Sequence, residues 1–255
     1  MESFPPLRRD ADFDSGHLWL REHVLGGRLR FRYDGGFNFG DETDAFAPGE
    51  EPLAVAAAVE AVRAEFAGKS FTAEVEEPSD YTFYGVATRE EGVTYDWARL
   101  PAFLGTAICR PDGSLLPVDV AHAAFERLGL VPLNVFEREL PARDFDFEHH
   151  DTPASAWYDG PAAGTRIRQK DGPETVFFGP VGEPVSTAEG CSPEAFVDQY
   201  VTPERVAETT AALAAPSVER VRDRLLARLV RRHYAELADT DGLRAAAMEP
   251  VARYR

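Results

Sequence analysis

The chain has 255 residues, of which 44% are hydrophobic and 11% aromatic, and this composition is typical of a folded protein and excludes a disordered chain. Its 44 acidic and 27 basic residues give a formal charge of −17, and only Lys69 and Lys170 are lysines. An acidic surface with arginine in place of lysine favours solubility in high salt, so we expect a halophile's cytoplasm, with an ordinary acidic protein as the alternative. No apolar run is long enough to span a membrane, and we expect neither a signal segment nor a membrane partner.

The first predicted elements are strands. From residue 18 to 39 apolar and polar residues alternate, and the alternation is interrupted by glycines at 26–27 and 35–36. Period-two spacing with glycine punctuation predicts three strands separated by turns. The segment 50–68 has an apolar face at helical spacing, acids at its start and a glycine at its end, and it predicts a helix.

Extended segments dominate as far as residue 180. One further helix is predicted over 118–130, ending at Gly129. The remaining segments alternate around turns, and they are 81–90, 102–118, 130–141 and 155–180. Many strands with few helices predict an α+β fold of mainly antiparallel sheets flanked by helices.

A different pattern begins near residue 189. The segments 192–215, 217–238 and 240–254 have helical spacing, and residues 1–188 carry nearly all of the net negative charge. The candidate N-caps are Ser192, Thr202, Ser217 and Thr240, with prolines following the first two. We therefore predict a sheet-rich domain over 1–188 and a small all-helical domain over 189–255.

Common catalytic and metal-binding motifs are missing. The sequence has neither a G-x-S-x-G elbow nor a G-x-x-x-x-G-K-[ST] loop. His149 and His150 are adjacent, but neighbouring residues rarely point at one ion, and Cys109 and Cys191 are too few for a four-ligand site. We expect no metal site, and we interpret the two histidines as a solvated loop pair.

An arginine stripe runs along the predicted helix at 217–238. Arg220, Arg224, Arg228 and Arg231 recur at spacings of four, four and three, and Arg232 follows. In a chain of charge −17, the stripe is a candidate site for a polyanion, because phosphate contacts need local positive charge. The alternatives are a solvated helix face with intrahelical ion pairs, and a surface that docks an acidic protein.

Several short blocks carry a family resemblance. In chain order they read "HVLGGR", "FYGV", "YDWARLPAFLGTAI" and "DGPAAGTRIRQKDG", and a helical tail follows. Their order resembles that of the RNA ligase family of ATP-dependent covalent nucleotidyltransferases, particularly the ligase-like proteins of archaea. That family has K-x-D-G-x-R with the nucleophilic lysine, F-x-G-E, an aromatic strand at the adenine, E-G-x-V-x-[RK] and K-x-K. The resemblance implies the ligase nucleotidyltransferase fold.

The catalytic positions of that family are substituted in this chain. His23 stands at the nucleophile position, and Leu25, Val86 and Ala163 replace the aspartate, the ribose glutamate and the metal carboxylate. No K-x-K follows in "PETVFFGP". The resemblance implies a nucleotide pocket at eight positions, of which the substituted Val86 is one. They are Gly26, Arg28, Gly85, Val86, Phe103, Gly164, Arg166 and Arg168.

Three functional hypotheses follow. The first is a catalytically degenerate ligase-like protein that binds RNA, a nucleotide or an active ligase paralogue, because cations and a metal carboxylate normally stabilise phosphoryl transfer. The second is an active nucleotidyltransferase in which His23 is the nucleophile, arginines replace the lost lysines, and ATP and Mg²⁺ are the cofactors. The third is an interaction protein unrelated to nucleotides, which uses the arginine-rich helix.

Overall fold

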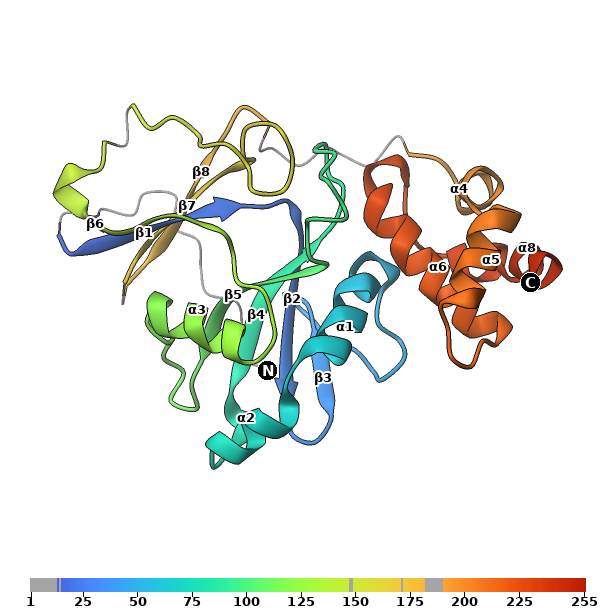
Figure 1. Cartoon of the computed structure of the whole chain (residues 1–255), viewed down its shortest axis with the longest axis horizontal. Helices are drawn as coiled ribbons and strands as arrows, with labels where there is room; N and C mark the ends of the chain where they lie inside the picture. Colours follow the sequence, from blue (N-terminus) through green and yellow to red (C-terminus); the bar gives the residue numbers. More distant parts are fainter. Residues whose placement is uncertain (1–12, 14, 147–148, 171, 182–189) are drawn as a thin grey trace.

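The computed structural model describes residues 13, 15–146, 149–170, 172–181 and 190–255. Two four-stranded antiparallel sheets form the region up to residue 181, called here the sheet region (Figure 1). In spatial order, sheet A consists of β6 (Val135–Pro141), β1 (His17–His23), β7 (Gly164–Gln169) and β8 (Glu174–Phe178). Sheet B consists of β3 (Phe37–Gly40), β2 (Gly26–Tyr33), β4 (Thr82–Thr88) and β5 (Phe103–Cys109). The predicted α+β class is confirmed.

The first two strands belong to different sheets. β1 ends at His23 and β2 begins at Gly26, so the chain crosses from sheet A to sheet B within two residues. The predicted turn at Gly26 and Gly27 is therefore wrong, because both residues pair with β4. Gly26 has φ 152°, and a Cβ there would lie 2.3 Å from the carbonyl oxygen of Ala87. This glycine permits the close approach of two strands.

Helices pack on one face of sheet B. They are α1 (Leu53–Glu65), α2 (Gly68–Glu74) and α3 (Val118–Arg127). α3 ends as predicted, with Gly129 at φ 82°. The helix predicted over 50–68 is shorter: its acids precede the cap at Pro52, and Phe66 ends it in an extended conformation. Gly68 begins α2, which the sequence did not predict.

The chain ends in a helical region, residues 190–255. It consists of α4 (Pro193–Tyr200), α5 (Pro203–Ala211), α6 (Val218–Arg232), α7 (Leu243–Ala246) and α8 (Met248–Tyr254). The side chains of Ser192, Thr202 and Ser217 cap α4, α5 and α6 as predicted. The prediction that Thr240 caps a helix is wrong, because the residue at the N-cap of α7 is Gly242, at φ 80°. The predicted boundary at 188 falls within 182–189, outside the described residues.

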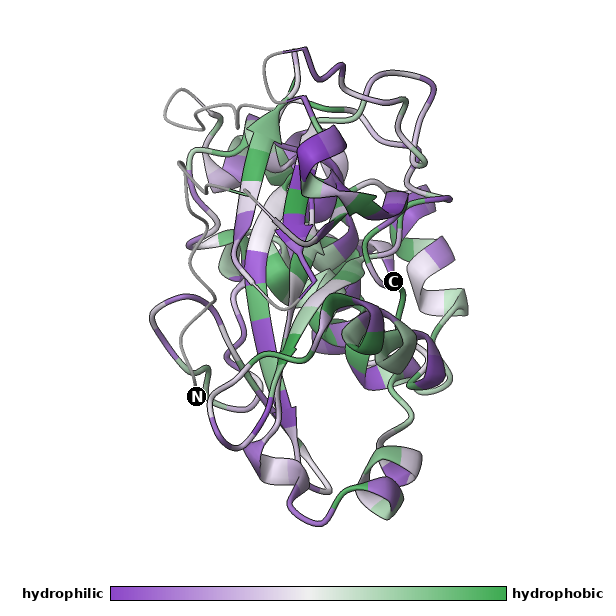
Figure 2. Ribbon diagram, turned by 90° about the vertical axis from the view of Figure 1, so that its left-hand side faces the viewer, coloured by the Kyte–Doolittle hydropathy of each residue, from purple (hydrophilic) through white to green (hydrophobic). Residues whose placement is uncertain are grey.

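Short 3-10 helices complete the secondary structure at Pro78–Asp80, Ala142–Asp144 and Tyr234–Glu236. Hydrophobic and hydrophilic residues both occur along the strands and helices (Figure 2). The largest apolar cluster lies between sheet B and its helices, and a second fills the helical region. Leu53 of α1 belongs to the second cluster, so the two regions are packed together. In the described part of the chain, no helix has the length and apolar character needed to cross a membrane.

Candidate functional site

The face of sheet A that points toward β5 carries charged side chains. Alternation along β1 places Arg21 and His23 on this face, and the register pairs Arg21 with Arg166 and His23 with Gly164. Arg21 Nη1 donates to the carbonyl oxygen of Thr106 in β5 at 2.8 Å, and Arg168 Nη2 donates to the carbonyl oxygen of Leu116 at 3.0 Å. The fold thus brings together His23, Arg166 and Arg168, which are distant in sequence.

Glu174 is the carboxylate at the centre of this cluster. Its Oε1 is 2.5 Å from Arg21 Nη2, and its Oε2 is 3.6 Å from Arg166 Nη1. Burial acts to raise the pKa of Glu174, but the charges of Arg21, Arg166 and Arg168 outweigh this effect and lower it. An internal carboxylate therefore supplies the counter-charge of the buried arginines on this face.

Arg21 and Glu174 were not among the predicted site residues. Arg21 lies two positions before His23 on the same strand, so period-two spacing was a signal that it shares the face. Glu174 carries no such signal, because its role depends on the pairing of β8 with β7.

His23 is largely enclosed. Its ring meets the ring of Phe178 edge-on, with centroids 5.4 Å apart, and its Nδ1 has no hydrogen-bond partner among the described residues. Burial first, and the charge of Arg166 second, lower the pKa of His23 to about 3. The imidazole is therefore neutral at pH 7 and cannot act there as a general acid.

The positions of the family's carboxylates lie in apolar surroundings. Leu25 and Ala163 both belong to one buried cluster, completed by Val24, Val93, Tyr95, Leu100, Leu104 and Leu133. The hydroxyl of Tyr95 accepts a hydrogen bond from the backbone N–H of Leu25 at 3.1 Å. Val86 is 4% exposed and packs where the Cβ of residue 26 would be. Ala163, at the position that the resemblance assigns to the metal carboxylate, offers no side-chain oxygen to a divalent cation, which needs oxygen ligands.

Three other predicted pocket residues lie apart from the Glu174 cluster. Phe103 is on the helix-facing side of sheet B, where its ring packs directly on Gly85. Arg28 is on the opposite side of sheet B, forms an ion pair with Glu42, and lines a hollow of about 270 Å³. The charge of Arg28 still contributes to lowering the pKa of Arg166, after the larger effects of burial and Arg21.

The arginine stripe lies at the contact between the two regions. A hollow of about 280 Å³ between α1 and α6 is lined by Arg224, Arg228, Arg231 and Arg232. Arg220 does not line it, because its Nη1 donates to the carbonyl oxygen of Ala215 at the start of α6. The structure thus separates Arg220 from the other four stripe residues.

The adjacent histidines have separate contacts. His149 Nδ1 lies 2.9 Å from Asp146 Oδ2, whereas His150 Nε2 lies 2.9 Å from Thr165 Oγ1. Within the residues that the structure describes, no group of three or more His, Cys, Asp or Glu side chains has the arrangement of a metal site.

Comparisons with known proteins identify the fold. No protein-family model and no curated protein sequence matches the chain. The match to the structure of an archaeal ATP-dependent RNA ligase covers 100% of this chain and 65% of that ligase chain, with 14% identity and a TM-score of 0.50. The match to a Naegleria gruberi RNA ligase mutant with ATP and Mn covers 65% of this chain and 50% of that ligase chain, with 10% identity and a TM-score of 0.51.

The fold is therefore that of the RNA ligase nucleotidyltransferases, as the resemblance predicted. This chain spans 65% and 50% of the lengths of those two ligases, and at this level of identity the likeness extends to the fold alone.

Proposed function

We propose that this protein is a catalytically degenerate member of the RNA ligase fold class that binds RNA without forming a covalent nucleotide intermediate. The observation that carries the proposal is the shared apolar cluster of Leu25 and Ala163. By the resemblance, an adenylating enzyme of this fold has the motif's aspartate and the metal carboxylate at these two positions, and this chain has buried apolar side chains there. The electrostatic stabilisation of phosphoryl transfer, normally worth several kcal/mol, has no source there.

His23 does not supply a substitute mechanism. A neutral imidazole has the lone pair that attack on phosphorus requires, but the ring meets only the ring of Phe178 edge-on, and no side chain of the described residues forms a hydrogen bond with its Nδ1 to orient it. Glu174 cannot hold a metal beside it, because both carboxylate oxygens face arginines. The same carboxylate competes with any nucleotide phosphate, so we expect weak ATP binding and favour RNA as the ligand.

The assignment of RNA rests on the likeness to RNA ligases and on the positive groups that the fold gathers in an acidic chain. A ligase paralogue is the alternative partner. RNA is preferred because the arginines are forked donors suited to phosphate oxygens.

Labelling with radioactive ATP tests the loss of adenylation. The full chain is incubated with α-labelled ATP and Mg²⁺ or Mn²⁺, and we expect no covalent AMP adduct after denaturing electrophoresis. His23→Ala is the matched variant. An adduct that forms on the native chain and is lost in this variant would establish His23 as a nucleophile and overturn the proposal.

A further inference from the structure

Two hollows lie on either side of α6 and share two arginines. The larger one, between α1 and α6, is lined by Arg224, Arg228, Arg231 and Arg232. The smaller one, about 70 Å³ between α5 and α6, is lined by Arg205, Arg228 and Arg232. Arg228 and Arg232 are one helical turn apart and stand between the hollows. The two hollows are therefore adjacent across α6, and together they are called here the α6 path; Glu208 also lines the smaller one.

The positive charge of this path is only partly balanced. Arg232 has no ion-pair partner in the described part of the chain, and Arg228 meets Glu208 through one contact of 3.0 Å. That contact is exposed and is therefore easily exchanged for another anion. The acids that line the larger hollow are Glu60, which pairs with Arg224, and Glu65.

Arg231 lines the larger hollow and is held in place by contacts with the sheet region. It donates to Thr88 Oγ1 at 2.9 Å and to the carbonyl oxygen of Leu100 at 2.6 Å, and it lies over the ring of Trp97. Burial, and then the charge of Arg232, lower the pKa of Arg231 to about 10. Arg231 stays charged at pH 7, and its neighbour Arg232 is the more exposed donor.

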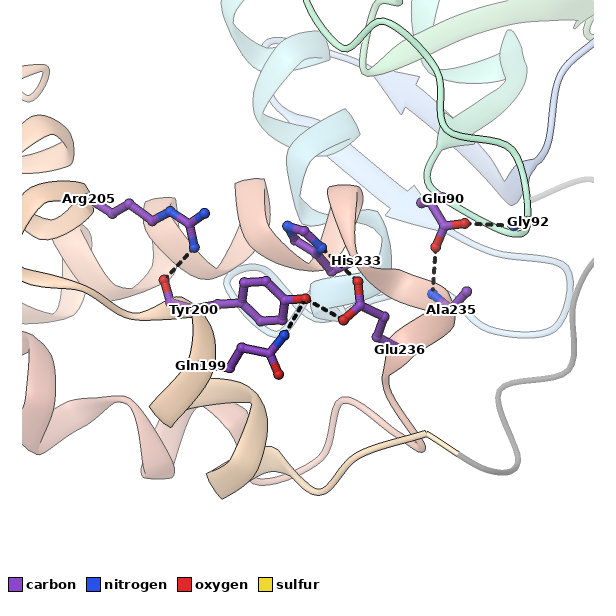
Figure 3. A network of polar contacts seen from close by, with 8 residues as sticks. All are labelled: Glu90, Gly92, Gln199, Tyr200, Arg205, His233, Ala235 and Glu236. Carbon is purple, nitrogen blue, oxygen red and sulfur yellow. Dashed lines mark hydrogen bonds and ion pairs between the residues drawn. The ribbon is translucent and has the colours of Figure 1, made fainter.

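The wall of the smaller hollow is held by a polar network (Figure 3). Arg205 Nη1 donates to the carbonyl oxygen of Tyr200 at 2.8 Å, and the ring of His233 stacks on that of Tyr200 with centroids 4.0 Å apart. Glu236 contacts both the Tyr200 hydroxyl and His233 Nδ1. These contacts fix α4, α5 and the end of α6 together, so the hollow is formed before any ligand arrives.

We propose that a single strand of RNA crosses α6 along the α6 path, with successive phosphate groups bound by Arg228 and Arg232. This inference rests on the proposed RNA-binding function and assigns its site. Guanidinium forks bind phosphate oxygens in pairs, and the small volume of the second hollow suits a phosphate group better than a nucleobase. Since the chain as a whole repels polyanions, contact depends on this local excess of arginine.

The test measures binding of labelled single-stranded RNA to the full chain by fluorescence anisotropy at several salt concentrations. The double variant Arg228→Gln with Arg232→Gln removes the shared arginines. The double variant Arg220→Gln with Arg253→Gln is the matched control, because it removes the same charge from α6 and α8 outside both hollows. Unchanged thermal unfolding of both variants establishes that they are folded.

We expect the first variant to bind more weakly. The slope of log K against log salt is negative, and its magnitude should decrease by about 1.4, which is about 0.7 for each lost phosphate contact. The control keeps the native slope. Equal binding by native chain and first variant overturns the α6 path but leaves RNA binding intact. No binding of RNA by the native chain overturns the proposed function itself. Tighter binding of an acidic peptide than of RNA overturns the choice of ligand.

Discussion

At the scale of single residues, Glu174 is the counter-charge of the arginines on the charged face of sheet A. Among the residues that the structure describes, it is the one carboxylate that forms ion pairs with both Arg21 and Arg166, and all three side chains are almost removed from solvent. A buried charge that loses its partner is costly, because neither water nor another group compensates it. We therefore regard Glu174 as a structural substitute for a bound anion.

Replacing Glu174 with glutamine is expected to lower the free energy of unfolding by about 3–5 kcal/mol, because two buried guanidinium groups lose their counter-charge. Glu249→Gln, at an exposed ion pair with Arg253, is the matched control and should change stability little. Urea denaturation followed by circular dichroism measures both. Equal stability of Glu174→Gln and native chain would contradict the structural role.

The pH dependence of the same variant gives a second readout. The pKa of Glu174 is lower in the folded state than in the unfolded state. Its stabilising contribution is therefore complete above the unfolded-state pKa and is lost as the pH falls through the folded-state pKa. The stability difference between native chain and Glu174→Gln should accordingly shrink as the pH is lowered from 7 into that range.

At the scale of elements, the helical region is defined by local capping. The hydroxyl of Ser217 accepts a hydrogen bond from the backbone N–H of Arg220 at 3.2 Å and so begins α6, the helix that carries the arginines. Thr240 has the same type of side chain, but α7 begins after Gly242. Residue type alone did not distinguish these two positions.

Ser217→Ala should cost about 1 kcal/mol, because an N–H at the start of α6 loses its acceptor. Thr240→Ala should leave stability nearly unchanged, since its side chain caps no helix. Thermal unfolding of the two variants under one set of conditions is the measurement. A larger loss for Thr240→Ala than for Ser217→Ala would show that the cap assignment is reversed.

At the scale of the whole molecule, the two regions share a core. Leu53, at the first position of α1, is 3% exposed and packs within the apolar cluster of the helical region. Arg231 of α6 reaches back to Thr88 and Leu100 in the sheet region. Because these contacts cross between the regions, we expect them to unfold together.

Leu53→Ala should lower stability by about 2–5 kcal/mol and uncouple the regions. The three tryptophans all lie in the sheet region, and Trp97 also lies against Arg231 of α6, so their fluorescence reports on the sheet region and on this one contact, whereas far-ultraviolet circular dichroism also reports on the helices. We expect the two transitions to separate in this variant. Val59→Ala, buried against sheet B, leaves the contact intact and should keep them coincident. Coincident transitions in Leu53→Ala would contradict the coupling.

The sequence by itself determined the α+β class, most strand positions, three of the four N-caps and the order of blocks that resembles the RNA ligases. Alternation and capping act between near neighbours in the chain, so they are readable without the fold. The prediction of a turn at Gly26 was wrong because the conformation of this residue depends on its pairing with β4, a strand about sixty residues away in the chain.

Only the tertiary structure decided how the charges are paired. Arg21 and Glu174 are 153 positions apart, and the arginines of α6 meet acids and carbonyl groups from α1, α5 and the segment after β4. The energy of a charged side chain depends on its burial and on its partners in space, and neither can be read from the spacing of residues along the chain. The sequence thus showed which residue types stand at the positions that resemble the ligase motifs, and the fold showed which side chains surround them.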